Sequence, residues 1–128
     1  MNLLLDTHAF LWAISDSSKL SSVARQCFLD PGNRLVFSAA SMWEIAIKQS
    51  IGKLSGPRPI LDVVGEELRI NGISWLGIEP EHCQHVAGLP FHHRDPFDRM
   101  LVSQAISESL QVLSADTQLD AYDVKRVW

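Results

Sequence analysis

Four short apolar runs lie along the chain, each bounded by polar or turn-forming residues. They are Leu3–Leu5, Leu35–Phe37, Ile73–Ile78 and Val112–Leu113. Short continuous apolar runs are typical of strands buried on both faces, as in a parallel sheet. We therefore predict one buried, mostly parallel sheet, with a last strand at Val124–Trp128.

Longer segments between these runs have apolar residues at helical spacing. Ser38 can cap a helix that continues toward Gly52, and a second helix is predicted from Ile60 to the Asn-Gly pair at 71–72. A third begins after Asp95, with the next residue, a proline, at its first position. Strands alternating with helices predict an α/β fold, a three-layer α/β/α sandwich around a central, mostly parallel sheet.

Length and composition bound the class of protein. The chain has 128 residues, of which 46% are hydrophobic, enough for one compact domain over 1–128 with its own core. Cys27 and Cys83 form no CxxC pair, so we expect two reduced thiols. Asp6 interrupts the first apolar run, and no run reaches the roughly 20 residues of a membrane span. We expect a soluble, cytoplasmic protein.

The net charge at first opposes a nucleic-acid partner, because 11 basic residues face 15 acidic ones. Four of the acids are candidates for one site, and setting them aside leaves a neutral scaffold. Two divalent cations at that site would supply positive charge where phosphate must lie. The acidic balance therefore allows an RNA substrate but argues against broad coating of nucleic acid.

Two of these acids follow strands. Asp6 comes directly after Leu3–Leu5, and Asp116 follows the strand at 112–114. Ligands of open α/β sheets bind at the carboxyl ends of the strands. The alternative for Asp6 is a helix cap before Thr7. Asp120 and Asp123 lie near Asp116 but have no strand end to present them.

The other two acids lie on predicted helices. Glu44 shares a mostly apolar face, although it is also spaced to pair with Lys48 or to close a capping box with Ser41. Asp98 has apolar neighbours three, four and seven positions later, so it lies on the stripe that faces the core. A carboxylate there is costly without a cation or several donors, although the helix dipole offers a simpler explanation. Asp95 is interpreted as a cap.

The four acids together carry the functional hypothesis. Asp6, Glu44, Asp98 and Asp116 come from separate segments that can converge above one sheet edge. Such a cluster repels itself, and a hard divalent cation relieves the repulsion. Oxygen ligands favour magnesium or manganese, ions that can promote hydrolysis of a phosphodiester.

Several short motifs resemble the PIN-domain family, and within it the VapC-type toxins of toxin–antitoxin pairs. They occur in family-like order over essentially the whole chain. They are Asp6-Thr7-His8-Ala9-Phe10-Leu11-Trp12, Ser38 with Glu44, His93-Arg94-Asp95-Pro96-Phe97-Asp98-Arg99, and Ser114-Ala115-Asp116.

The resemblance implies a doubly wound α/β/α fold and a Mg²⁺- or Mn²⁺-dependent endoribonuclease that cleaves structured RNA such as transfer RNA. It implies Asp6, Glu44, Asp98 and Asp116 as the acidic cluster. Thr7 and Ser114 would be hydroxyl groups that orient carboxylates or waters. It also implies a homodimer inhibited by a cognate antitoxin.

Other polar and aromatic residues have two readings each. His8, His92 and His93 either contact RNA or are solvated loop residues, and Arg94 and Arg99 either bind phosphate or pair with nearby acids. The tryptophans either stack on bases or form core and dimer contacts. The segment from Trp43 to Ile51 can help to form a groove for an antitoxin helix.

Rival functions remain open. A receiver-type magnesium-binding signalling module is disfavoured, because only Asp6 follows the first strand and Lys125 does not directly follow a clear strand. A PIN-like domain reduced to a binding module is disfavoured by the complete set of acids. A non-toxin nuclease acting in RNA processing or on DNA is compatible with the same residues.

Overall fold

The computed structural model describes residues 1–128 and contains one five-stranded sheet. The strand order is β3-β2-β1-β4-β5, and every neighbouring pair is parallel. The strands are β1 (Asn2–Leu5), β2 (Arg34–Ser38), β3 (Ser74–Leu76), β4 (Gln111–Leu113) and β5 (Arg126–Val127). The predicted parallel sheet is confirmed, including a last strand within 124–128. The run at 73–78 forms a shorter strand than predicted, because only three residues of the edge strand β3 pair with β2.

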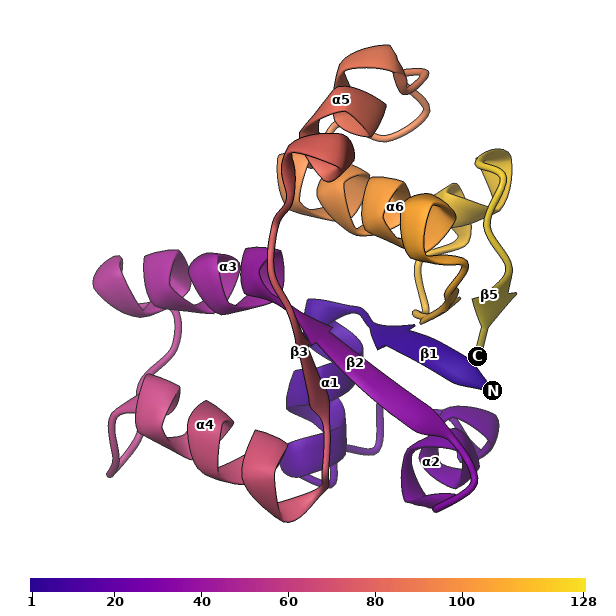
Figure 1. Ribbon diagram of the computed structural model, residues 1–128. Helices are drawn as coiled ribbons and strands as arrows, with labels where there is room; N and C mark the ends of the chain where they lie inside the picture. The colour runs from indigo at the N-terminus through magenta and orange to yellow at the C-terminus, as the bar shows by residue number, and fades with distance from the viewer.

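Six α-helices and one 3-10 turn connect the strands (Figure 1). They are α1 (Thr7–Ile14), α2 (Ser22–Leu29), α3 (Ala39–Ser50), α4 (Ile60–Ile70), α5 (Pro80–Gly88), α6 (Pro96–Glu108) and η1 (Thr117–Ala121). The helices expected after Ser38, from Ile60 and after Asp95 are α3, α4 and α6. Helices α2 and α5, both of which are short, were not predicted.

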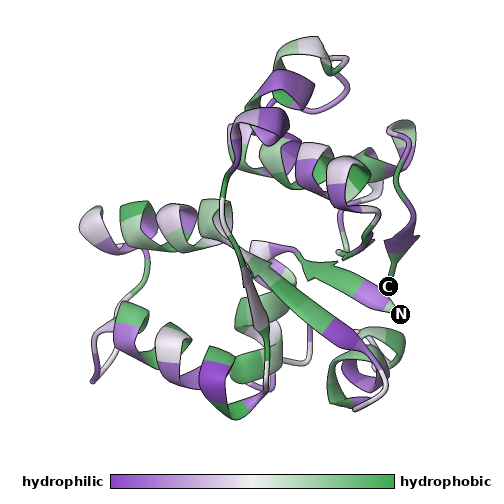
Figure 2. Ribbon diagram, in the orientation of Figure 1, coloured by the Kyte–Doolittle hydropathy of each residue, from purple (hydrophilic) through white to green (hydrophobic).

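Alternate residues of the strands face two separate cores, which explains the continuous apolar runs. Leu3, Leu5 and Phe37 pack with α1, α2 and α4 on one face of the sheet. Leu4 and Val36 pack with α6 on the other, and α5 lies against α6. Figure 1 shows these helices on opposite sides, and in Figure 2 β1 and β2 are coloured mostly as hydrophobic. The molecule is therefore the predicted three-layer α/β/α sandwich.

A polar connection holds α6 against the carboxyl end of β2. Ser38 caps α3 by accepting a hydrogen bond from the Ala40 amide at 3.0 Å, and its hydroxyl donates to Oε1 of Gln104 on α6 at 2.5 Å. Both side chains are fully buried. The start of α3 and the second half of α6 thus lie beside the carboxyl end of β2.

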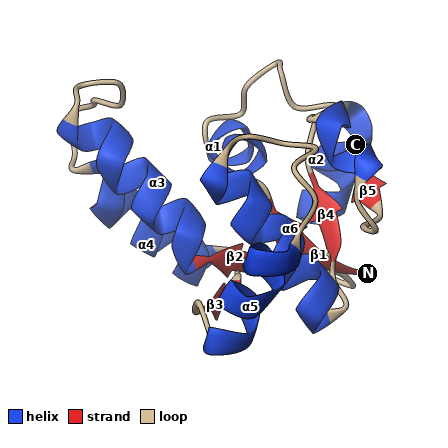
Figure 3. Cartoon of the chain, turned by 90° about the horizontal axis from the view of Figure 1, so that it is seen from above, coloured by secondary structure: helices blue, strands red, loops and turns tan.

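Helices α3 and α4 lie side by side and project from the body of the molecule, as the view from above shows (Figure 3). None of the helices combines the length and the apolar character needed to cross a lipid bilayer.

Candidate active site

Asp6 is both a helix cap and a member of the acidic site. It follows β1, and its backbone amide donates to the Leu113 carbonyl at 3.1 Å, at the end of β4. Oδ1 accepts from the amides of His8 at 2.7 Å and Ala9 at 3.3 Å. Oδ2 accepts from the Ser114 hydroxyl at 2.6 Å. Asp6 can therefore cap α1 through Oδ1 and contribute Oδ2 to the acidic site.

Ser114 connects Asp6 to Asp116. The same hydroxyl that donates to Asp6 accepts from the Asp116 amide at 3.0 Å. Oδ1 of Asp116 accepts from the Gln118 amide at 3.0 Å and caps η1. Its other oxygen faces His93. Ser114 thus holds the loop after β4 so that both aspartates lie at one strand-end edge.

Asp120, the alternative to Asp116, is engaged elsewhere. Its two carboxylate oxygens accept from Nε and Nη2 of Arg126 at 2.8 and 3.1 Å. The hydrogen bond from Arg126 lowers the pKa of Asp120 below its ordinary value. Of these two acids, only Asp116 faces the histidine and Asp98.

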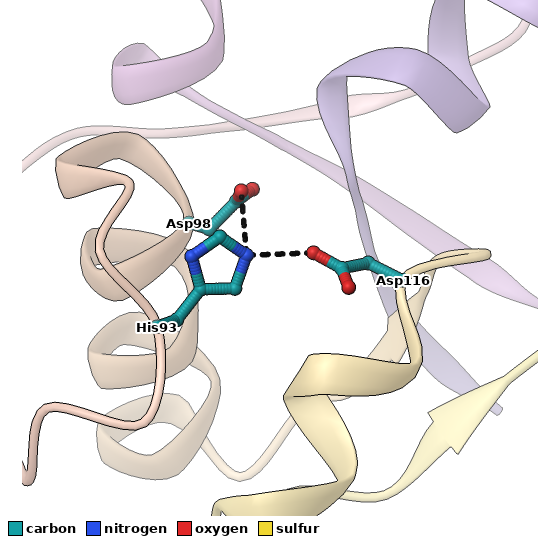
Figure 4. A group of neighbouring side chains, drawn as sticks. All are labelled: His93, Asp98 and Asp116. Atoms are coloured by element: carbon teal, nitrogen blue, oxygen red, sulfur yellow. Dashed lines mark hydrogen bonds and ion pairs between the residues drawn. The ribbon is translucent and has the colours of Figure 1, made fainter.

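His93 lies between two carboxylates (Figure 4). Its Nε2 is 2.7 Å from Oδ2 of Asp116 and 3.3 Å from Oδ2 of Asp98. Nδ1 accepts a hydrogen bond from the Asp95 amide at 3.1 Å. Because Nδ1 is the acceptor, Nε2 carries the ring proton and donates toward the carboxylates. In this arrangement His93 orients acids and is not itself a free metal ligand.

From the sequence, His93 was one of three histidines that either contact RNA or are solvated, and it was not assigned to the acidic cluster. One signal was available, since His93 lies two residues before the helix cap Asp95. Because the Asp95 amide donates to its Nδ1, the His93 ring lies beside the first turn of α6, which carries Asp98.

Glu44 is buried on α3 and has one cationic partner. Its Oε2 is 3.1 Å from Nζ of Lys48, the pairing that the i, i+4 spacing predicts. The Glu44 side chain is only 9% exposed, whereas that of Lys48 is 25% exposed, so the pair holds a buried carboxylate under a partly exposed ammonium group. The capping box with Ser41 does not form, because α3 begins earlier and Ser38 caps it.

The pKa of Asp98 reflects its burial and the negative charges around it. Burial is the largest cause that raises the pKa of Asp98 from its ordinary 3.8 to about 7. The charge of Asp95 raises it further, as do those of Asp6 and Glu44, whereas His93 lowers it. Neither Asp98 nor Asp116 pairs with a lysine or arginine. Asp98 therefore carries repulsion that no fixed cation relieves.

Arg99 and Thr7 make no hydrogen bond to an acid of the site. Arg99 neither faces a phosphate site nor pairs with an acid, because its buried guanidinium donates to the carbonyls of Pro90 at 2.8 Å and Leu89 at 3.1 Å. The Thr7 hydroxyl donates to Oγ of Ser41 at 2.9 Å and makes no hydrogen bond to a carboxylate.

The acidic site suits a hard divalent cation. Carboxylate oxygens from the ends of β1 and β4 and from α3 and α6 supply the donors that magnesium and manganese prefer. A cation there would relieve the repulsion that raises the pKa of Asp98. His93, Asp98 and Asp116 each bring a potential ligand atom within 4.8 Å of the others. We favour the two carboxylates of this group, because Nε2 of His93 carries a proton.

Solved structures with the same fold cover nearly the whole chain. A structure of VapBC2 from Rickettsia felis bound to a DNA fragment from their promoter has a TM-score of 0.69, 13% identity and 100% coverage of both chains. FitAcB from Neisseria gonorrhoeae has a TM-score of 0.65 and 18% identity, covering 97% of this chain and 95% of that one. VapBC-1 from nontypeable Haemophilus influenzae has a TM-score of 0.59 and 18% identity, covering 98% and 96%.

Sequence comparison identifies one curated relative and one family. The relative, Ribonuclease VapC16 of Mycobacterium tuberculosis, is 41% identical over 56 residues. That match spans 44% of this chain and only 40% of the relative. The model of the PIN domain family, by contrast, matches residues 3–125. Because this match includes every strand-end and helical acid of the site, the chain belongs to the PIN-domain family.

Proposed function

We propose that this protein is a metal-dependent endoribonuclease and the toxin of a toxin–antitoxin pair. In this proposal it acts in the cytoplasm and hydrolyses structured RNA such as transfer RNA. The observation that carries the nuclease proposal is the pKa of Asp98, which burial and the charges of Asp95, Asp6 and Glu44 raise to about 7. Asp116 lies in the same cluster, and neither Asp98 nor Asp116 pairs with a lysine or arginine. The cation would be Mg²⁺ or Mn²⁺, held by Asp6, Glu44, Asp98 and Asp116.

A divalent cation bound there supplies positive charge beside the scissile phosphate and makes a water molecule more acidic. The chain's own residues fix the geometry of the acids. The amides at the start of α1 and the Ser114 hydroxyl orient the two oxygens of Asp6. His93 orients Asp98 and Asp116, and Lys48 orients Glu44. Positioned groups of this kind are the usual supports of metal ligands.

The named relatives support the biological part of the proposal. One is called a ribonuclease, and two of the similar structures are VapBC pairs. We accordingly propose a small antitoxin protein as the partner of this chain, and a homodimer as its assembly.

Cleavage of RNA in defined metal conditions tests the nuclease proposal. Purified protein should cleave a transfer RNA pool with Mg²⁺ or Mn²⁺ and lose this activity in excess EDTA, because the carboxylates then have no cation to hold. Single-stranded DNA of matched length serves as the control for substrate class. Equal cleavage in EDTA would rule out a metal-dependent mechanism. Faster cleavage of DNA than of RNA would show that DNA is the substrate.

Growth of a bacterial host tests the toxin proposal separately. Induced expression of the protein without a partner should slow growth, because cleavage of RNA needed for translation stops protein synthesis. The Asp98→Asn variant, expressed to the same level, should leave growth unchanged. If the wild-type protein has no effect on growth but cleaves RNA in vitro, the toxin assignment is wrong and the nuclease assignment stands.

A further inference from the structure

A second hollow adjoins the acidic site. The first hollow, of about 280 Å³, is lined by Asp6, His8, Trp12, Ala115 and Asp116. The second, of about 460 Å³, is lined by His8 and Trp12 again, together with Leu11, Lys48, Lys53 and Leu54 among others. The two hollows share His8 and Trp12 in their walls, so they lie next to each other along α1, and we refer to this adjoining pair as the groove.

The groove gathers most of the chain's lysines. The chain has four lysines and a net charge of −4. Lys48 and Lys53 line the second hollow, and Nζ of Lys19 lies 5.9 Å from the centre of the Trp12 ring. Lys19 and Lys53 are exposed and form no salt bridge. Three of the four lysines therefore line the groove or lie beside its tryptophan.

Lys48 connects the two parts of the groove. Its Nζ is 3.1 Å from Oε2 of Glu44, in the acidic site, and 3.4 Å from Nε2 of His8, in the wall of both hollows. A negatively charged ligand that leaves the acidic site toward the second hollow passes this ammonium group first, and then reaches Lys53.

Trp12 is a fixed aromatic surface in this groove. It is half-buried on α1 and packs edge-on against Trp128, with ring centres 5.8 Å apart and an interplanar angle of 61°. The exposed His8 ring lies 5.8 Å from it. A large, positioned aromatic ring with lysines around it is the arrangement by which proteins bind single-stranded nucleic acid, through base stacking and phosphate contacts.

We propose that this groove binds the single-stranded RNA segment next to the scissile phosphate. One base stacks on Trp12, and the neighbouring phosphates contact Lys48 and Lys53. This inference rests on the proposed function, since it names the path of the substrate at that site. It also explains how a chain of negative net charge attracts RNA, because the attraction is local.

Binding of RNA without cleavage tests the groove. The parent protein carries Asp98→Asn to prevent turnover, and the probe is a fluorescein-labelled single-stranded RNA of about twelve nucleotides, within the usual site size. We expect Trp12→Leu to weaken binding on the order of tenfold, whereas Trp12→Phe, which keeps an aromatic face, stays close to the parent. Trp75→Leu removes an exposed tryptophan on β3 and serves as the control.

The salt dependence of RNA binding tests the contacts between lysines and phosphates. Lys53→Ala should lower the slope of log K against log salt by about 0.7, the amount for one phosphate contact on a single strand. Lys125→Ala, an exposed lysine outside the groove, should leave that slope unchanged.

Four results would contradict binding of RNA in the groove. They are equal affinities for Trp12→Leu and Trp75→Leu, an unchanged salt slope in Lys53→Ala, equal binding of a duplex of the same sequence, and displacement of the RNA by an equal concentration of polyglutamate peptide. The last result would indicate an acidic protein partner. If the groove variants weaken binding but the unmodified protein cleaves no RNA with any metal, the nuclease proposal fails and the binding groove stands.

Discussion

Two adjacent residues at the start of α6 show two different fates of a charge removed from water. Asp98 faces the acidic site, where burial and other carboxylates raise its pKa to about 7 and only His93 opposes them. Arg99, 5% exposed, turns toward the segment after α5. Its guanidinium donates to the carbonyls of Pro90 and Leu89 and stacks 3.9 Å from the centre of the Phe91 ring.

The two side chains differ in whether neighbouring groups compensate for the loss of water around the charge. Buried charge costs free energy unless hydrogen bonds or an opposite charge offset the loss of water. Arg99 has that compensation from the backbone, so it serves the fold by tying the segment after α5 to α6. Asp98 lacks it. Of these two charges, only the Asp98 carboxylate indicates a ligand-binding site, because its burial costs free energy that no lysine or arginine offsets.

The largest effect should come from removing the charge of Asp98 in an activity assay. Asp98→Asn should reduce RNA cleavage by at least about a thousandfold, because an amide is a poor cation ligand and cannot take up a proton. Initial rates on a labelled RNA measure this. Asp120→Asn is the matched control, since Asp120 pairs with Arg126 outside the site. If the two variants have equal rates, Asp98 has no special role.

The complementary experiment removes the compensated charge. Arg99→Met should lower the free energy of unfolding by about 3 kcal/mol, because several backbone carbonyls lose a charged donor inside the protein. Denaturant titration followed by circular dichroism gives this value. Arg94→Met, at an exposed position, should change it by less than about 0.5 kcal/mol. A loss in Arg99→Met as small as in the control would show that the hydrogen bonds of Arg99 contribute little.

The smallest effect concerns stability and pH without divalent metal. Asp98 has a folded pKa of about 7 and an ordinary value of 3.8, so between these values the folded state binds the extra proton. Its contribution to the free energy of unfolding therefore falls as pH rises from about 4 through 7. Asp98→Asn should be more stable than the wild type at pH 8, by on the order of 2 kcal/mol after solvent screening.

Thermal unfolding in EDTA at pH 4 and pH 8 measures this difference, which should nearly vanish at the lower pH. Added Mn²⁺ should raise the midpoint of the wild type at pH 8 more than that of Asp98→Asn. A variant less stable than the wild type at pH 8 in EDTA would contradict the repulsion assigned to this site.

The parallel sheet was predictable because strands buried on both faces leave continuous apolar runs in the sequence. The cap at Asp95 was predictable because capping depends on neighbours two and three residues away, and the Asp95 carboxylate indeed accepts from the amides of Phe97 and Asp98. Helices α2 and α5 were missed, since each has only eight or nine residues and buries few of them.

The roles of charged residues were only partly predictable. Asp98 and Arg99 are sequence neighbours, and no local pattern says that one turns toward three other acids and the other toward the carbonyls after α5. His93 was not assigned to the acidic cluster for the same reason, because its partner Asp116 is 23 residues away in the chain.

The sequence by itself determined the strands, the longer helices α3, α4 and α6, and which acids stand at strand ends and on those helices, since these depend on residues a few positions apart. The tertiary structure decided which of those acids meet, which are neutralised by a cation, and that three lysines and a tryptophan lie beside them. Such long-range placement depends on how the sheet edge brings distant segments together, and Coulomb interactions respond to that distance in space and not to distance along the chain.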